Sequence, residues 1–197
     1  MSAAQAPIVG LFAGGQAKRM GGGSKALLVA PGSSREPIAA RMLRIVRDVG
    51  LEMVVIGAVP DGALPAGVVE LLRLPDAPPA VGPLGGLGAL LAHAGARPVI
   101  AVACDMPYVT AELLAKLARA PSSADVLAPR DPQTGKWQPL FARYATAQVH
   151  AALVATLAAG DRSFQALFTR LRCEELPLDK AEHEQLRDWD LPSDVHT

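Results

Sequence analysis

Near its N-terminus the chain has a short apolar run that leads directly into a stretch rich in glycine and cations. Residues 8–12 read IVGLF, which is typical of a short buried strand. Residues 14–25 read GGQAKRMGGGSK and hold five glycines and three cations. Glycine lets the backbone come close to a ligand, and successive backbone N–H groups can form a concave anion site. The pattern predicts a phosphate-binding loop at the carboxyl end of a parallel strand.

Two common phosphate loops do not fit this stretch. The P-loop needs Gly-Lys-Ser/Thr, but Lys25 stands between Ser24 and Ala26. The dinucleotide fingerprint G-x-G-x-x-G is absent because Gln16 follows the first glycine pair. Since Lys25 follows a glycine triplet and a serine, we expect it on an exposed, mobile loop. A flexible surface loop without any ligand is the plain alternative.

Composition narrows the class of ligand. Lysine plus arginine equals aspartate plus glutamate at 19 each, and aromatic residues make up 4% of the chain. Nucleic-acid-binding proteins usually carry a basic excess, and single-strand binders need aromatic stacking platforms. We therefore expect a small anionic ligand and no nucleic acid.

Targeting signals and cysteine usage bear on location. No run approaches the roughly 18 apolar residues of a membrane span, so we expect no membrane contact. The first seven residues, MSAAQAP, lack the features of a signal peptide. Cys104 and Cys173 show no metal-binding spacing and indicate no disulfide scaffold. These features favour a cytoplasmic protein.

Short apolar runs alternate with helical stretches along the chain. We expect strands at residues 8–13, 53–57, 68–72, 99–104 and 126–129, and helices at 37–49, 85–94, 111–119, 147–158 and 164–171. Nearly continuous apolar strands are typical of parallel sheets that are buried on both faces. The alternation predicts an α/β fold, a three-layer α/β/α sandwich with a Rossmann-like, mostly parallel sheet, in one domain spanning residues 1–197.

The last third of the chain changes character. Turn residues at 131–135 join the run at 126–129 to a further expected strand at 136–144. This arrangement predicts an antiparallel excursion near residues 125–144. Residues 173–176 are expected to form an edge strand. Thr110 is the expected N-cap of the helix at 111–119, and Asp161 or Ser163 the cap of the helix at 164–171.

The first loop also matches the pattern L-A-G-G-x-x-x-R-M-G-x-x-K, with Phe12 in place of its leucine. This pattern resembles the signature of nucleotidyltransferases that take a nucleoside triphosphate and a phosphorylated acceptor, above all the molybdenum cofactor guanylyltransferases, a MobA-like NTP transferase family. The resemblance covers nearly the whole chain and is specific in the first loop and at Asp105. It implies nucleotide-binding residues at Phe12, Ala13, Gly14, Gly15 and Lys25. We expect Arg19 and Lys25 to act in catalysis by stabilising the leaving pyrophosphate.

Asp105 follows the apolar run at 99–104 directly. An acidic residue at the carboxyl end of a central strand faces the crevice where α/β proteins bind ligands, and a lone carboxylate suits Mg²⁺. In the family that the first loop resembles, the aspartate of a C-D-x-P segment holds the metal. We therefore expect Asp105 to be a catalytic residue that binds Mg²⁺ and the nucleotide. The alternative is that Asp105 only ends the strand or caps residues 108–110.

Two further segments resemble the nucleotide site of the family. Asp76 stands where related enzymes carry an aspartate that contacts the nucleotide, although proline-rich loops often carry solvated aspartates. The glycine cluster at 82–88 resembles a G-P-L-x-G stretch that lies against the base, which implies contacts from Gly82, Pro83, Leu84 and Gly86. Close packing of a helix on the sheet would require the same glycines.

Residues 188–194, DWDLPSD, resemble an N-x-N-T-P-E-D box of the family. The position that often carries a metal- or ligand-facing asparagine is Asp188 or Asp190 here, and we take Asp190 as the weaker second metal candidate. An acidic tail patch is the alternative. Residues 136–141, KWQPLF, resemble the acceptor-side strand. Gly57 departs from the family, where this position often carries an asparagine that touches the base.

The leading hypothesis is transfer of GMP from GTP to Mo-molybdopterin, with Mg²⁺ as cofactor and pyrophosphate as the leaving group. The sequence Phe-Ala-Gly-Gly is closer to the L-A-G-G of the guanylyl branch than to the T-A-A-G of the cytidylyl branch. The resemblance implies GTP and a phosphorylated pterin acceptor as partners, and transient contact with proteins that handle the molybdenum cofactor. The alternatives are a cytidylyltransferase or sugar-phosphate nucleotidyltransferase of the same fold, or a non-catalytic nucleotide-binding protein.

Overall fold

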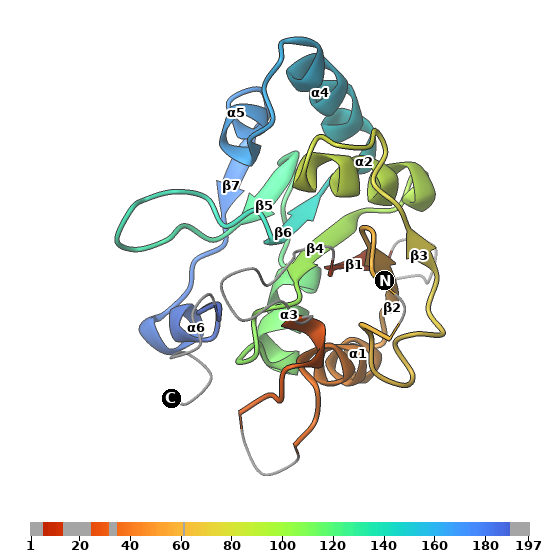
Figure 1. Ribbon diagram of the computed structural model, residues 1–197. Helices are drawn as coiled ribbons and strands as arrows, with labels where there is room; N and C mark the ends of the chain where they lie inside the picture. Colours follow the sequence, from red (N-terminus) through yellow and green to blue (C-terminus); the bar gives the residue numbers. More distant parts are fainter. Residues whose placement is uncertain (1–5, 14–24, 32–34, 61, 190–197) are drawn as a thin grey trace.

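A twisted sheet runs through the centre of the molecule with helices on both faces (Figure 1). The computed structural model describes residues 6–13, 25–31, 35–60 and 62–189. Within them the sheet has seven strands in the order β3-β2-β1-β4-β6-β5-β7. The strands are β1 (Ile8–Phe12), β2 (Glu52–Ile56), β3 (Arg73–Leu74), β4 (Val99–Ala103), β5 (Val126–Ala128), β6 (Phe141–Tyr144) and β7 (Cys173–Glu175).

The sheet is parallel except for β6. Strands β1 and β2, β1 and β4, β2 and β3, and β5 and β7 pair in parallel. Strand β6 runs antiparallel to both β4 and β5, with Val102 opposite Phe141. This geometry confirms the predicted mostly parallel sheet with an antiparallel excursion.

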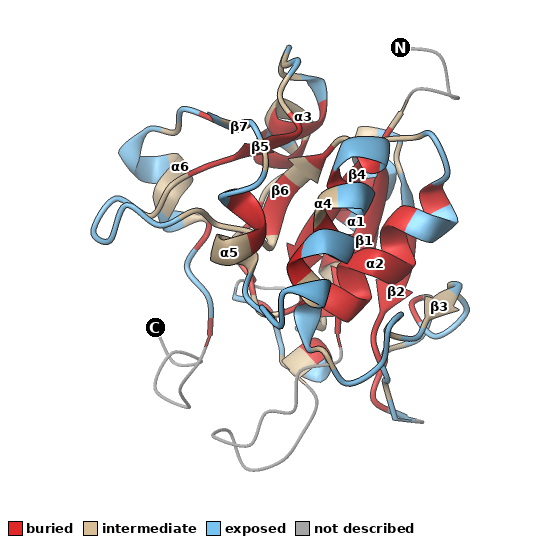
Figure 2. Ribbon diagram, turned by 90° about the horizontal axis from the view of Figure 1, so that it is seen from above, coloured by how far each residue is buried: buried red, intermediate tan, exposed pale blue. Residues whose placement is uncertain are grey.

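The helices form the two outer layers. They are α1 (Ile38–Val49), α2 (Pro83–Ala94), α3 (Ala111–Arg119), α4 (Thr146–Ala158), α5 (Phe164–Phe168) and α6 (Lys180–Glu184), with a 3₁₀ helix, η3 (Lys25–Leu27). Helices α1 and α3 cover one face of the sheet, and α2 and α4 cover the other (Figure 1). The inward faces of these helices and the strands are buried (Figure 2), so each face has its own apolar core.

Helix ends follow the expected chemistry. The Thr110 hydroxyl accepts a hydrogen bond from the Leu113 backbone N–H at 3.3 Å, which caps α3 as predicted. Ser163 rather than Asp161 caps α5, with its hydroxyl accepting from Ala166 N. Gly50 ends α1 at φ 80°, a conformation that glycine adopts without strain.

Two of the expected strands differ in the structure. Residues 68–70 form a turn, residues 71 and 72 belong to no strand, and the strand is only Arg73–Leu74. The reason is local: Pro65 and the positive φ of Gly67 begin a turn in which Val68 and Val69 donate to the Pro65 carbonyl. In the expected strand at 136–144, only Phe141–Tyr144 forms a strand, because Pro139 lacks an N–H and Phe141 N turns back onto Gln138 O.

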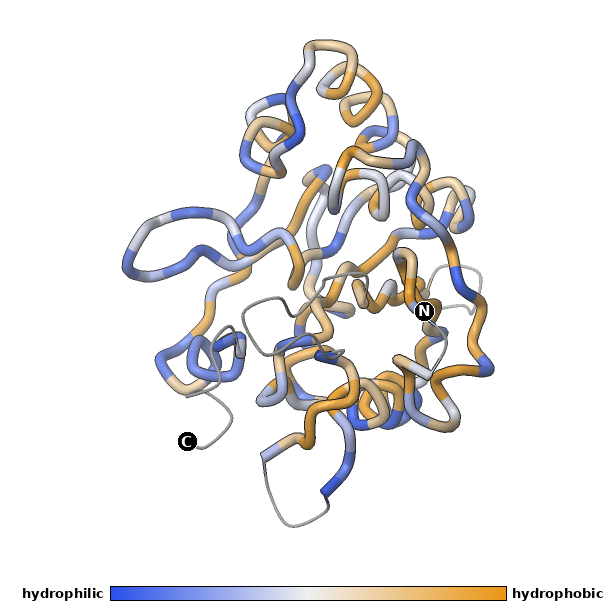
Figure 3. The backbone as a smooth tube through the Cα atoms, in the orientation of Figure 1, coloured by the Kyte–Doolittle hydropathy of each residue, from blue (hydrophilic) through white to orange (hydrophobic). Residues whose placement is uncertain are grey.

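The connection between β5 and β6 leaves the body of the molecule as a loop. In Figure 3 this loop, residues 131–136, is hydrophilic along most of its length, and it is held by turn bonds to the Asp131 carboxylate. Within the described part of the chain, every helix is too short or too polar to cross a membrane.

The order of the strands sets the place of the site. From β1 the chain moves outward through α1 to β2 and β3, and then returns through α2 to β4 on the other side of β1. The carboxyl ends of β1 and β4 therefore lie next to each other where the strand order reverses. In open α/β sheets this switch point is where ligands bind.

Candidate active site

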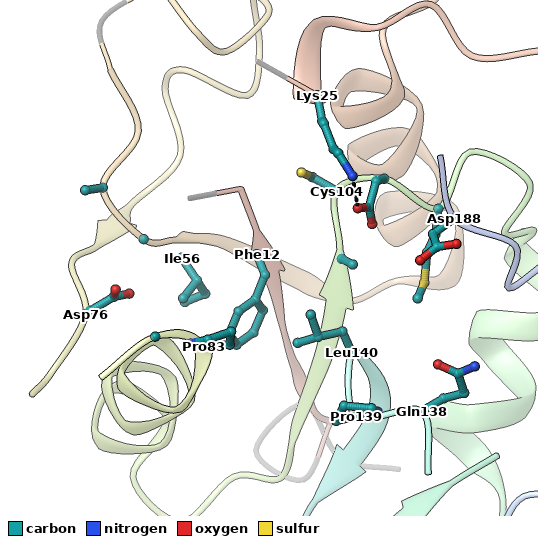
Figure 4. A pocket seen from close by; sticks show the side chains of 16 residues that line it. Phe12, Lys25, Ile56, Asp76, Pro83, Cys104, Gln138, Pro139, Leu140 and Asp188 are labelled. Carbon is teal, nitrogen blue, oxygen red and sulfur yellow. Dashed lines mark hydrogen bonds and ion pairs between the residues drawn. The ribbon is translucent and has the colours of Figure 1, made fainter. Parts of the chain in front are cut away.

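A cavity of about 510 Å³ lies at the carboxyl ends of β1, β2 and β4 (Figure 4). It is lined by Phe12, Lys25, Ile56, Gly57, Ala58, Asp76, Gly82, Pro83, Ala103, Cys104, Asp105, Met106, Gln138, Pro139, Leu140 and Asp188. Residues from distant parts of the sequence thus meet at the predicted edge of the sheet.

An ion pair stands at the centre of this cavity. Lys25 Nζ lies 2.8 Å from Asp105 Oδ2, and the two side chains are 13% and 20% exposed. Asp105 follows β4, and its strand end is tied to β1 by a hydrogen bond from Cys104 N to Phe12 O at 3.2 Å. Lys25 begins η3, and Ala26 beside it is fully buried. The expectation of an exposed lysine is therefore wrong, because η3 packs against the core and directs the amine into the cavity.

One half of the cavity has apolar walls and a single carboxylate. Phe12, Ile56 and Pro83 form the walls, and Asp76 lies beyond them in Figure 4. Gly57 follows β2 with φ 100°, and its N–H donates to Leu74 O. Gly57 itself lines the cavity.

The glycines of α2 serve two different purposes. Gly82 and Pro83, at the N-terminus of α2, line the cavity. Leu84 and Gly86 are buried and lie behind the wall. A Cβ on Gly86 would meet Ile56 Cγ2 at 2.6 Å and Phe12 Cε1 at 2.8 Å. Gly86 thus allows α2 to approach the strand ends. For this glycine the structure supports close packing of the helix on the sheet, the alternative to contact with the base.

The other half of the cavity is formed by the β6 side of the sheet and by the C-terminal segment. Gln138, Pro139 and Leu140 precede β6, and the Tyr144 hydroxyl holds this segment by donating to Pro139 O at 2.6 Å. Asp188 lies on the same side, across the cavity from Asp76 (Figure 4).

Cys104 lies beside the central ion pair and is 4% exposed. Burial raises the pKa of its thiol to about 12, and the negative charge of Asp105 acts in the same direction. The thiol is therefore neutral near pH 7 and is a poor nucleophile.

The predicted site residues divide into three groups. Those that line the cavity are Phe12, Lys25, Asp76, Gly82, Pro83 and Asp105. Ala13, Leu84 and Gly86 are buried and do not line it. Gly14, Gly15, Arg19 and Asp190 lie outside the described residues.

Sequence reasoning missed several wall residues. Ile56, Ala58, Ala103 and Met106 line the cavity without a motif of their own. The signal that could have found them is position, since each lies at or just after the carboxyl end of a central strand.

The donor set suits a hard cation that takes few protein ligands. Among the described residues, no three histidine, cysteine, aspartate or glutamate side chains gather as a metal site. Asp105 and Asp188 nevertheless present carboxylates to the same cavity. Mg²⁺ commonly uses one or two carboxylates together with substrate phosphates and water, so these residues fit such an ion.

Comparison with known proteins agrees with this geometry. The family model of the MobA-like NTP transferase domain matches residues 9–175. A molybdenum cofactor guanylyltransferase of Xanthomonas euvesicatoria is 34% identical over 192 residues, covering 95% of this chain and 92% of that protein. A probable molybdenum cofactor guanylyltransferase of Pelotomaculum thermopropionicum is 35% identical over 141 residues, covering 72% of this chain and 64% of that protein.

A solved structure shares the fold. The molybdopterin-guanine dinucleotide biosynthesis protein A of Archaeoglobus fulgidus superposes with a TM-score of 0.72 at 21% identity, covering 96% of this chain and 95% of that one. The family model spans most of the chain, and the Xanthomonas relative keeps more than 30% identity over nearly its full length. This chain therefore belongs to the MobA-like NTP transferase family and is a nucleotidyltransferase.

Proposed function

We propose that this nucleotidyltransferase moves GMP from GTP to Mo-molybdopterin, which forms the guanine dinucleotide cofactor and releases pyrophosphate. The observation that carries the proposal is the Lys25–Asp105 pair, which stands at the switch point between the two halves of one cavity. The relatives named above as molybdenum cofactor guanylyltransferases support the choice of substrates.

The half of the cavity with Phe12, Pro83 and Asp76 suits a purine nucleotide. Its apolar walls can hold the faces of a base, while the Asp76 carboxylate is an acceptor for two adjacent N–H donors. Guanine presents such a pair at N1 and N2, and charge-assisted bonds of this kind are strong.

The half with Gln138, Leu140 and Asp188 is the proposed acceptor side. An oxygen of the acceptor phosphate forms a bond to the α-phosphorus of GTP, the bond from that phosphorus to the bridging oxygen breaks, and pyrophosphate leaves. A phosphomonoester is largely dianionic near neutral pH, since its second pKa is about 6. No side chain has to act as a general base, so the chain's task is alignment and charge neutralisation.

Asp105, with Asp188 beside it, would hold a divalent cation, which we propose to be Mg²⁺. When bound, such an ion supplies Lewis-acid neutralisation of phosphate charge. Lys25 brings a further positive charge into a partly dehydrated cavity, where it can bind triphosphate oxygens. Arg19 and the glycines at 14 and 15, which lie outside the described residues, are proposed to bind the same phosphates, and Asp190 stays a weaker metal candidate.

Partners and location follow from the same proposal. We propose GTP and a phosphorylated pterin as the substrates, with transient contact to proteins that handle the molybdenum cofactor. A cytoplasmic location, where GTP and reduced cysteines are found, stays a prediction.

Turnover with each triphosphate tests the proposal. The purified protein is mixed with Mo-molybdopterin, a divalent cation and either GTP or CTP, and pyrophosphate release is followed. We expect kcat/KM for GTP to exceed that for CTP by about tenfold or more, since the site is built for a purine edge. Equal or higher kcat/KM for CTP would support the cytidylyltransferase alternative, for which the departures at Phe12 and Gly57 are the specific observations.

Ligand-induced stabilisation gives a second measurement that needs no pterin. A ligand at 100 times its Kd adds about 2.7 kcal/mol to the free energy of unfolding. GTP with Mg²⁺ should therefore raise the Tm clearly more than CTP with Mg²⁺ at the same concentration. Binding of GTP without any turnover would favour the non-catalytic alternative.

A further inference from the structure

We propose that Trp189 is a positioning residue of this active site: its side chain fastens the C-terminal segment to the two segments that carry Lys25 and Asp105. The proposal rests on the proposed function for the roles of those two residues. Trp189 itself does not line the cavity, so it acts through its neighbours.

The indole of Trp189 lies in a small apolar cluster of its own. Trp189 is 1% exposed and packs with Ala30 and Ile38, while Leu28 and Tyr108 border the same cluster. This cluster is separate from the two large cores on either side of the sheet. Its members come from the segment after η3, the start of α1, the segment after Asp105 and the C-terminal segment, so Trp189 joins parts that the sheet does not join directly.

On one side Trp189 contacts the segment that carries Lys25. Leu28 comes three residues after Lys25 and is held to α1 by a hydrogen bond from Ile38 N to Leu28 O at 2.8 Å. Ala30 N donates to Glu36 O at 2.8 Å in the same ladder. Because this ladder is the surface on which the indole rests, loss of the indole would loosen the support of η3 and of Lys25.

On the other side Trp189 contacts the segment that carries Asp105. Trp189 N donates to the Asp105 carbonyl at 3.0 Å, and the indole Nε1 donates to the Tyr108 hydroxyl at 3.2 Å. The two rings meet edge to face with centroids 6.1 Å apart. Arg187 adds a hydrogen bond of 2.9 Å to the same hydroxyl. The segment that carries Asp105 is thus held through both its backbone and its side chains.

The same contacts place Asp188. This residue lies between Arg187 and Trp189, both bonded to Tyr108, so its carboxylate is presented to the cavity by two anchored neighbours. Three groups of the proposed chemistry, Lys25, Asp105 and Asp188, therefore share one support. Residues that hold metal ligands in place commonly change metal affinity by tenfold or more, about 10- to 100-fold, when they are replaced.

The test measures cation binding apart from turnover. The concentration of free Mn²⁺ is measured by electron paramagnetic resonance in the presence of enzyme and GTP. The temperature is kept well below the Tm of each variant. We expect Trp189→Leu to raise the Mn²⁺ Kd about tenfold and to lower kcat. Trp189→Phe keeps an aromatic ring in the cluster, so its Mn²⁺ Kd and its kcat should lie between those of Trp189→Leu and the wild type. Tyr108→Phe, which removes only the shared hydroxyl, should raise the Kd by a smaller factor.

Hydrogen exchange provides a readout that needs neither nucleotide nor metal. Peptides that cover residues 25–30 and 103–110 should exchange faster in Trp189→Leu than in the wild type, because both segments lose their shared support. Peptides from β1 and α2 should not change. If the wild type proves to use CTP, that result overturns the proposed function alone. The hydrogen-exchange measurement still tests the role of Trp189, because it needs no nucleotide.

Phe168→Leu is the matched control. Phe168 is a buried aromatic residue, 4% exposed, in the opposite core, where its ring neighbours are Trp137, Tyr144 and Phe164. The substitution Phe168→Leu should lower the Tm and leave the Mn²⁺ Kd unchanged. Wild-type Kd, kcat and exchange in Trp189→Leu would overturn the proposal, as would an equal rise in Kd in Phe168→Leu. If Trp189→Leu does not fold, unchanged Kd and exchange in Tyr108→Phe overturn it.

Discussion

Lys25 Nζ donates a hydrogen bond of 2.8 Å to Asp105 Oδ2, although the two residues lie 80 positions apart in the chain. The ammonium group therefore sits on the carboxylate that the proposed reaction assigns to a divalent cation. Two cations that share one carboxylate oxygen compete for it. Binding of a triphosphate, which offers Lys25 other negative oxygens, should favour cation binding at Asp105.

Replacing Lys25 by methionine tests this competition. Lys25→Met should increase the affinity for Mn²⁺ in the absence of nucleotide by about three- to tenfold, since one adjacent positive charge is lost. It should at the same time lower kcat/KM for GTP, because the triphosphate loses a cationic contact. Electron paramagnetic resonance of free Mn²⁺ and steady-state kinetics provide the two measurements.

A second lysine provides the control for that variant. Lys116 pairs with Glu182 at 2.7 Å and lies away from the cavity. Lys116→Met should change neither Mn²⁺ affinity nor kinetics. If Lys25→Met binds free Mn²⁺ no better than the wild type, the two cations do not compete.

Asp105→Asn should keep the fold and lose most cation-dependent turnover. The amide no longer offers a charged ligand, and we expect kcat to fall about 100-fold or more, which is about 3 kcal/mol of transition-state stabilisation. Kinetics over a range of Mg²⁺ concentrations, with circular dichroism as the check on folding, measure the effect. Asp48→Asn, at an exposed aspartate that forms an ion pair on α1, should behave as the wild type. Wild-type turnover in Asp105→Asn would mean that Asp105 only ends its strand.

Asp76→Asn should reduce selectivity for GTP. Loss of a charged acceptor that faces a base is worth about 1.5–3 kcal/mol, so kcat/KM for GTP should fall about 10- to 100-fold. Because Asp76 is half-buried at the edge of the cavity, the Tm should change little. The ratio of kcat/KM for GTP and CTP is the decisive quantity. An unchanged ratio would make Asp76 a solvated loop residue.

Gly86→Ala should harm both folding and nucleotide binding. The new methyl group would meet Ile56 Cγ2 at 2.6 Å and Phe12 Cε1 at 2.8 Å, and two strand-end side chains would have to move. Overpacking of this kind typically costs about 1–3 kcal/mol. Denaturant unfolding should show that loss, and KM for GTP should rise because Phe12 is displaced in the cavity wall. Normal stability in this variant would contradict the close packing of α2 on the sheet.

Asp125→Asn should remove a pH-dependent contribution to stability far from the cavity. Hydrogen bonds from the Arg172 side chain and backbone hold the pKa of Asp125 below its usual value. A lowered pKa in the folded state stabilises the protein above the unfolded-state pKa of about 3.9, and this stabilisation is lost as the pH falls through the folded-state pKa.

Measurement of the free energy of unfolding at two pH values checks this effect. At pH 7 the variant should be less stable than the wild type by about 1–2 kcal/mol, since charge-assisted hydrogen bonds between the residues that precede β5 and β7 are lost. The difference should shrink as the pH approaches 3. A difference that stays constant with pH would rule out the ionised carboxylate as its source.

Local pattern was sufficient for most elements of this fold. Apolar runs such as those at β1 and β4 predict buried strands wherever they lie in the sheet, and Thr110 predicts the start of α3 from its side chain alone. The pattern was not sufficient at residues 68–72, which start in a turn and form no strand. The apolar side chain of Val68 predicts that this residue is buried, and it is. It does not predict whether the buried residue lies in a strand or in a turn.

For the site, the sequence by itself determined which chemistry the chain carries: a glycine-rich basic loop, an aspartate after a central strand and a glycine cluster before a helix. These signals are local, because each depends on residues next to one another. Only the tertiary structure decided that Lys25 is paired with Asp105 rather than solvated, that Gly86 packs behind the cavity wall while Gly82 lines it, and that Asp188 reaches the cavity. These relationships join residues from distant parts of the chain, and side-chain direction and packing, which set them, have no signature in local sequence.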